Sequence, residues 1–130
     1  MITKEEIGKG YDKIAEKIYV SEDFYNEVLD IEPDFKGDIL EAGVGQGVVL
    51  ANIARRGGKN ICSLTGIDLS DRLLEMAKKL LPQAKIIKAD VEAMSFVDAS
   101  FDFVVMVDTF QYLQDFVAQY FSGCWLLLLD

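Results

Sequence analysis

The sequence predicts a single α/β domain in three α-β-α layers, built on a doubly wound and mainly parallel sheet. Short apolar segments alternate with segments of helical periodicity, as expected of βαβ units joined by right-handed crossovers. A length of 130 residues fits one domain. With 51% hydrophobic and 27% charged residues, the composition is typical of a globular chain and not of a disordered one.

The first thirty residues predict two helices. Thr3 and Glu6 have the spacing of a capping box, which begins the first helix. Ser21 is the expected N-cap of the second helix, which ends before Pro33. We expect the first helix to pack through an apolar stripe at helical spacing. The stripe consists of Ile7, Tyr11, Ile14 and Ile18.

Five later segments predict strands. The fourth is apolar on both faces over most of its length, as expected of a buried parallel strand. A further helix is expected from about Thr109. The five segments are 38–42, 61–67, 85–89, 101–107 and 125–129.

Two amphipathic helices are expected between the first three strands. Gly57 and Gly58 end the first of them, Ser70 caps the second, and Pro82 stops it. The residues expected to face inward are Val49, Leu50, Ile53 and Ala54 in the first helix, and Leu73, Leu74, Ala77, Leu80 and Leu81 in the second.

Charge and composition disfavour several classes of function. The formal net charge of −9 disfavours DNA and RNA as partners, because nucleic-acid binders need a basic face. The chain has no histidine, which removes Ser-His-Asp and Cys-His nucleophiles and the commonest metal ligand. Cys62 and Cys124 lack metal-ligand spacing and are interpreted as small core residues, so no metal site is expected.

The sequence shows no address signal. Its longest apolar run, 124–129, is far shorter than the roughly 20 residues of a membrane span. The charged N-terminus lacks the apolar stretch of a signal peptide. We therefore expect a cytoplasmic protein that does not interact with membranes.

Acidic residues follow successive predicted strands. Glu41, Asp68 and Asp90 close the first, second and third strands, and Asp108 comes just after the fourth. Ligands of open parallel sheets bind beyond the carboxyl ends of the strands. We therefore expect these side chains to face one crevice, although Asp108 is also a good helix cap.

A glycine-rich turn follows the first strand and allows the backbone to approach a ligand closely. Gly43, Gly45 and Gly47 have the spacing G-x-G-x-G, whereas the dinucleotide fingerprint would need its third glycine at Val48. A pyrophosphate would also be repelled by Glu41. The pattern therefore favours a nucleoside that carries a positive group and argues against a nicotinamide-dependent oxidoreductase.

The spacing of two carboxylates matches a nucleoside. Asp68 stands 25 positions after Gly43, close to the roughly 20 residues at which an acidic residue binds ribose hydroxyls in such folds. Asp90 could accept from an adenine amine, with Val91 supplying a backbone N–H. The alternatives are that Asp68 simply precedes a capped helix and that Asp90 is an ordinary turn residue.

Four segments together resemble the motifs of the class I, Rossmann-like, S-adenosylmethionine-dependent methyltransferases. The resemblance covers roughly positions 9 to 115 and implies a sheet of strand order 3-2-1-4-5. The segments are Ile39-Leu40-Glu41-Ala42-Gly43-Val44-Gly45-Gln46-Gly47, Gly66-Ile67-Asp68-Leu69-Ser70, Ala89-Asp90-Val91-Glu92-Ala93-Met94-Ser95-Phe96 and Ser100-Phe101-Asp102-Phe103-Val104-Val105.

The resemblance implies a role for each matching residue. Glu41 and the glycine turn would hold the methionine portion of S-adenosylmethionine, and Tyr11 would close over it. Asp68 would bind the ribose, Leu69 would flank the adenine, and Asp90 with Val91 would read the adenine edge. Asp108 would lie near the methionine amino group and is a weak candidate for orienting the acceptor.

The chain departs from the family pattern after the fourth strand. The helix before strand five is short, and the last two strands of the family are missing, which implies a C-terminally truncated domain. The apolar edge at 125–129 would then be bare, so a homodimer through this edge is one expectation. Two functions remain open: methyl transfer to a small-molecule acceptor, giving S-adenosylhomocysteine, or a catalytically silent cofactor-binding or interaction module.

Overall fold

The structure is a computed structural model, and it describes residues 2–18, 23, 26, 29–30, 34–93, 100–107 and 125–129. The described residues form a five-stranded parallel sheet of order β3-β2-β1-β4-β5, as predicted. The strands are β1 (Gly37–Ala42), β2 (Ile61–Asp68), β3 (Lys85–Lys88), β4 (Phe103–Val107) and β5 (Trp125–Leu129).

The predicted strand boundaries are close to the observed ones, and the largest difference is at β4. This strand begins at Phe103, two residues later than predicted. Asp102 is used differently, because its backbone N–H donates to the carbonyl oxygen of Asp38 and its Oδ2 accepts from the N–H of Asp38, both at 2.8 Å. This exchange fixes the start of β1 against the loop that enters β4.

Alternate residues of the central strands enter two separate cores. Ile39 and Val105 pack with helices α3 (Val48–Gly57) and α4 (Asp71–Leu80) on one face. Leu40 and Val104 pack on the opposite face with Val91 of the short 3-10 helix η3 (Val91–Ala93). The period of two in the strands therefore accounts for burial on both faces.

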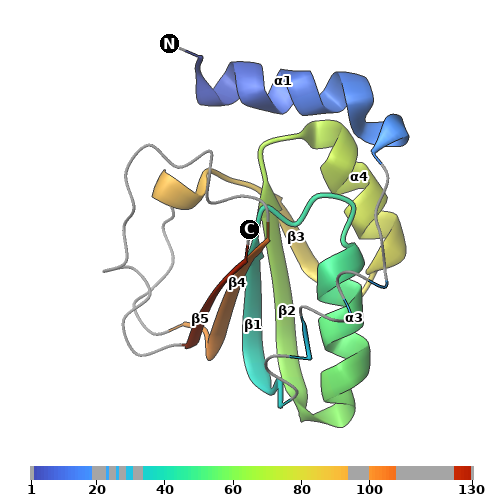
Figure 1. Cartoon of the computed structure of the whole chain (residues 1–130), viewed down its shortest axis with the longest axis vertical. Helices are drawn as coiled ribbons and strands as arrows, with labels where there is room; N and C mark the ends of the chain where they lie inside the picture. The colour runs from blue at the N-terminus through green and yellow to red at the C-terminus, as the bar shows by residue number, and fades with distance from the viewer. Residues whose placement is uncertain are drawn as a thin grey trace.

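Helices α3 and α4 lie together on one face of the sheet (Figure 1). Ser70 caps α4 as predicted, with its Oγ accepting from the N–H of Leu73 at 3.2 Å. Gly58 caps the carboxyl end of α3 and begins the 3-10 helix η2 (Gly58–Asn60). The helix expected from about Thr109 falls on residues that lie outside the described ones.

Among the strands and the helices between them, two predictions of buried side chains were wrong. Leu80 is 49% exposed, because Leu81 at the end of α4 takes the inward position and is only 2% exposed. Cys62 is exposed, because β3 pairs with β2 only from Thr65 onward and leaves the first residues of β2 uncovered on that side. Cys124 lies outside the described residues.

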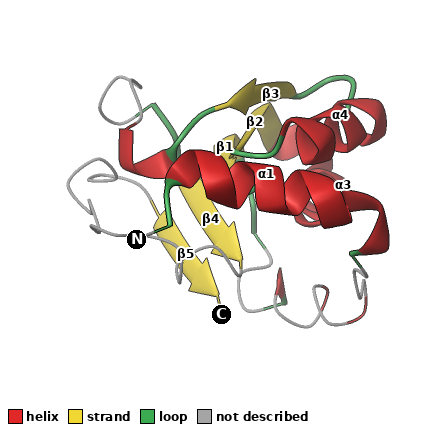
Figure 2. Cartoon of the chain, turned by 90° about the horizontal axis from the view of Figure 1, so that it is seen from above, coloured by secondary structure: helices red, strands yellow, loops and turns green. Residues whose placement is uncertain are grey.

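Helix α1 (Lys4–Ile14) crosses the carboxyl ends of the strands, as Figure 2 shows from above. The predicted capping box is present, with Thr3 and Glu6 bonded reciprocally. The 3-10 helix η1 (Ala15–Lys17) continues it. The predicted second helix lies mostly outside the described residues. Within the described part of the chain, we find no helix with the length and apolar character needed to cross a membrane.

Candidate functional site

Glu41 is the penultimate residue of β1 and is only 1% exposed. The backbone N–H of Leu50, in the first turn of α3, bonds to its carboxylate, but Oε1 has no hydrogen-bond partner among the described residues. Burial raises the pKa of Glu41 well above its usual range, and the negative charge of Asp68 raises it further. Because an unpaired buried carboxylate is costly, this position indicates a place for a cationic group.

The glycine turn after β1 folds back onto the end of β2. The N–H groups of Gly43 and Val44 donate to the carbonyl oxygen of Ile67 at 2.8 and 2.9 Å. Gly45 and Gly47 have positive φ values of 53° and 90°, which side chains disfavour. A Cβ on Gly45 would meet no described atom within 4 Å, whereas one on Gly47 would lie 3.3 Å from α4. The turn is therefore open at Gly45 and packed at Gly47.

Asp68 ends β2 and ties the glycine turn to the segment that follows. Its Oδ2 accepts from the N–H of Gly45 at 2.9 Å, and its Oδ1 accepts from the N–H groups of Leu69 and Ser70 at 2.7 and 3.1 Å. Burial raises the pKa of Asp68, and these three N–H groups partly offset the effect. Carboxylate oxygens have further lone pairs, so the side chain is oriented and can still accept from a ligand hydroxyl.

Asp90 lies two residues beyond β3. The chain there is close to the end of β2, because the N–H of Ala89 donates to the carbonyl oxygen of Asp68 at 3.2 Å. Asp90 Oδ1 accepts from the N–H of Glu92 at 3.0 Å and lies 3.8 Å from Lys4 Nζ of α1. The turn interpretation of Asp90 is therefore correct for this oxygen, and Oδ2 leaves a second acceptor.

The register of the sheet brings the three predicted carboxylates to one edge. Glu41 pairs with Gly66, which precedes Asp68 by two residues in β2. Asp68 pairs with Lys88, which precedes Asp90 by two residues. The three acidic residues therefore lie at neighbouring strand ends, beside the glycine turn.

Residues 39–128 match a family model described as a methyltransferase domain. The chain belongs to this family. It is 28% identical over 127 residues to the demethylmenaquinone methyltransferase of Thermotoga maritima. That alignment covers 87% of the chain and 53% of the relative, so the chain spans about half the length of the curated relative it matches.

Solved structures of low sequence identity share the fold of the methyltransferase domain. A Methanococcus maripaludis protein assigned provisionally to the S-adenosylmethionine-dependent methyltransferases has a TM-score of 0.68 at 16% identity, covering 98% of this chain and 64% of that one. A methyltransferase from Thiobacillus denitrificans, crystallised with S-adenosylhomocysteine, has a TM-score of 0.65 at 22% identity, covering 88% and 52%.

The remaining predicted site residues of the methyltransferase domain are less closely tied to the glycine turn. Leu69 follows Asp68 directly and is half-buried. Val91 is buried and packs against the second face of the sheet. Tyr11 is half-buried in α1, and Asp108 lies outside the described residues.

The contacts of α1 were missed because the sequence analysis followed its apolar stripe. Ile14 of that stripe is 47% exposed. The buried positions are instead Gly8 and Ala15, which share a face with Lys4 and Asp12 at a spacing of three or four residues. A stripe of small and polar residues at that spacing was the signal that could have identified the docking face of this helix.

Proposed function

We propose that this methyltransferase domain binds S-adenosylmethionine and transfers its methyl group to a small-molecule acceptor by in-line displacement. The observation that carries the proposal is the buried Glu41 carboxylate, whose Oε1 lacks a partner among the described residues beside a glycine turn that is open at Gly45. A cationic ligand would supply the missing partner, whereas a pyrophosphate would be repelled.

The residues at the strand ends fit the parts of this cofactor. Glu41 and the glycine turn would hold the cationic methionine portion, and Asp68 would accept from the ribose hydroxyls. Leu69, Asp90 and Val91 would flank and read the adenine. The S-adenosylhomocysteine bound to the Thiobacillus denitrificans neighbour supports this choice of ligand.

When bound, the cofactor supplies an electrophilic methyl group on a positively charged sulfonium, and the protein contributes position and exclusion of water. The charge of Glu41 stabilises the ligand's positive end. Because burial raises the pKa of free Glu41, a cation that favours its ionised form would lower that pKa again. Binding should therefore release a proton over the pH range between the two values.

The acceptor is proposed to be a small molecule. The relative from Thermotoga maritima is named for a small-molecule acceptor, demethylmenaquinone, and a net charge of −9 disfavours nucleic acids. Asp108 remains the candidate for orienting an amine or hydroxyl group of the acceptor. Tyr11, on the helix that crosses the strand ends, is proposed to close over the methionine end.

Calorimetry with S-adenosylmethionine, S-adenosylhomocysteine and NAD in parallel tests the cofactor. We expect the two adenosyl ligands to bind and NAD to bind weakly or not at all, and tighter binding of NAD would overturn the proposal. Methyl transfer to a panel of small acceptors that includes demethylmenaquinone tests the reaction. Cofactor binding without turnover on any acceptor would favour the silent module instead.

A further inference from the structure

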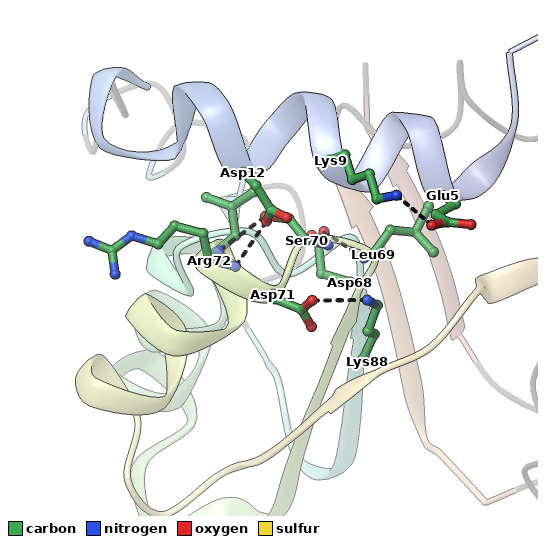
Figure 3. A network of polar contacts seen from close by, with 10 residues as sticks. Glu5, Lys9, Asp12, Asp68, Leu69, Ser70, Asp71, Arg72 and Lys88 are labelled. Carbon is green, nitrogen blue, oxygen red and sulfur yellow. Dashed lines mark hydrogen bonds and ion pairs between the residues drawn. The ribbon is translucent and has the colours of Figure 1, made fainter.

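Helix α1 is attached to the segment after β2 by one carboxylate. Asp12 Oδ1 accepts from the hydroxyl of Ser70 at 2.5 Å and from the backbone N–H of Arg72 at 3.0 Å. Figure 3 shows Asp12 pointing from α1 toward these two residues, with Asp68 drawn next to Ser70. These contacts join residues that are 58 and 60 positions apart in the sequence.

Ser70 connects Asp12 to Asp68 through its own hydrogen bonds. The side chain of Ser70 is fully buried, and its hydroxyl both donates to Asp12 and accepts from the N–H of Leu73. The backbone N–H of the same residue donates to Asp68 Oδ1 at 3.1 Å. Asp68 Oδ2 in turn holds the N–H of Gly45. A continuous chain of hydrogen bonds thus runs from α1 to the glycine turn.

Close packing holds α1 at this position. A Cβ on Gly8 would overlap the carbonyl oxygen of Leu69 and would lie 3.1 Å from its carbonyl carbon. Glycine therefore allows the helix backbone to rest directly on the residue that follows Asp68. On the other side, the amide of Gln46 donates to the carbonyl oxygens of Ala15 and Ile18 at 3.0 and 3.3 Å.

We propose that Asp12 is a positioning residue for the ribose site: it fixes Ser70 and thereby the orientation of the Asp68 carboxylate. This inference rests on the proposed function, because it takes Asp68 as the group that accepts from the ribose hydroxyls. Without Asp12, the hydroxyl of Ser70 and the backbone N–H of Arg72 lose their acceptor. The Asp68 oxygens then lose orientation toward the ligand, although Asp12 itself need not touch it.

A neighbouring carboxylate on η1, the continuation of α1, provides the matched control. Glu16 pairs with the guanidinium of Arg72, so it also connects this helical segment to α4. Glu16 is exposed and bonds to a side chain at the surface, whereas the hydrogen bonds described for Ser70 and Asp68 involve other residues. Glu16→Gln therefore weakens the attachment of α1 while leaving the hydrogen bonds of Ser70 in place.

Calorimetry with S-adenosylhomocysteine and its 2′-deoxy analogue tests the inference. Asp12→Ala should weaken binding of S-adenosylhomocysteine about tenfold, the change expected when about one hydrogen bond to a charged group is lost. Binding of the 2′-deoxy analogue should fall less than about threefold, since it lacks a hydroxyl that Asp68 would hold. Asp12→Asn keeps an acceptor oxygen and should retain most of the affinity, and Glu16→Gln should affect both ligands equally.

Amide hydrogen exchange in the free chain gives an independent measure. Asp12→Ala should accelerate exchange at Gly45 and Ser70 more than Glu16→Gln does. Equal losses for the two ligands, or unchanged exchange at these amides, would overturn the role of Asp12 while leaving the cofactor proposal intact. Failure of the unmodified chain to bind either ligand would overturn the proposed function and this inference together.

Discussion

Carboxylates beneath α1 and carboxylates on α1 occupy opposite electrostatic environments. Beneath the helix, burial is the main cause that raises the pKa of both Glu41 and Asp68. On the helix, the Ser70 hydroxyl is the main cause that lowers the pKa of Asp12, and a bond to Arg72 lowers that of Glu16. The charged form of a carboxylate is therefore destabilised beneath the helix and stabilised on it.

This difference separates two roles. A carboxylate that favours its charged form in the free chain already has its partners, and it fastens one element to another. A carboxylate that is held in its disfavoured form is a candidate for binding a ligand that would stabilise the charge. Glu41 is the extreme of the second kind, because one of its oxygens has no partner among the described residues.

The largest effect is expected when Glu41 loses its charge. Glu41→Gln keeps the shape of the side chain but leaves a cationic ligand without its counter-charge, and breaking a buried charge pair typically costs about 3–5 kcal/mol. We expect affinity for S-adenosylmethionine to fall more than about 100-fold by calorimetry. Glu5→Gln, an exposed change on α1, is the control and should leave the affinity unchanged. Similar affinities for both variants would place the cation elsewhere.

A smaller loss is expected from Asp68→Ala. The ribose hydroxyls would lose their acceptor, and unsatisfied buried hydroxyls cost about 1–3 kcal/mol of binding free energy. The variant also frees the N–H groups of Gly45, Leu69 and Ser70, so its free energy of unfolding should decrease as well. Calorimetry on S-adenosylhomocysteine and urea denaturation separate the two effects. Unchanged affinity in a folded variant would mean that Asp68 serves only to join the two turns.

The sequence was sufficient to predict the sheet and the carboxylates beneath α1, which are Glu41 and Asp68 and are called the inner carboxylates here. Both follow from short-range periodicity. Alternating apolar segments gave the strands, and a strand end determines where its last side chain lies. Glu41 stood out because an acidic residue within an apolar strand has few structural explanations. The coupling between Glu41 and Asp68 then follows from the register of β1 and β2.

The docking of α1 could not be predicted in the same way. Its apolar stripe suggested burial of Ile14, but the helix rests on strand ends and loops that present polar backbone groups. Contact with such a surface favours small residues and hydrogen-bonding side chains, which Gly8 and Asp12 provide. Partners 60 residues away along the chain leave no local signal in one sequence.

The inner carboxylates should make the free chain less stable as pH rises. Unfolded Glu41 loses its proton near its ordinary pKa of 4.5, while the folded chain retains the proton up to the raised value. Between these values the folded state binds more protons, so the free energy of unfolding falls as pH increases, by at most about 1.4 kcal/mol per pH unit for one group. Urea denaturation from pH 4 to pH 8 should show the free energy of unfolding of Glu41→Gln increasing relative to that of the unmodified chain. A constant difference across this range would mean that Glu41 is charged throughout.

The outer carboxylates, those of the N-terminal helical segment, should show the opposite dependence. The amplitude should be smaller, because Asp12 is only half-buried and solvent partly screens its charge. The folded pKa of Asp12 is lower than its ordinary value of 3.8, so its stabilising contribution is complete above that value and is lost as pH falls through the folded pKa. Asp12→Asn should therefore be less stable than the unmodified chain at pH 6, and the two should converge on acidification below pH 3.8. Glu41→Gln also diverges from the unmodified chain as pH rises, but it becomes the more stable of the two, whereas Asp12→Asn becomes the less stable. Were both variants to diverge from it in the same direction, the two layers of carboxylates would share one environment and the distinction between fastening and binding groups would fail.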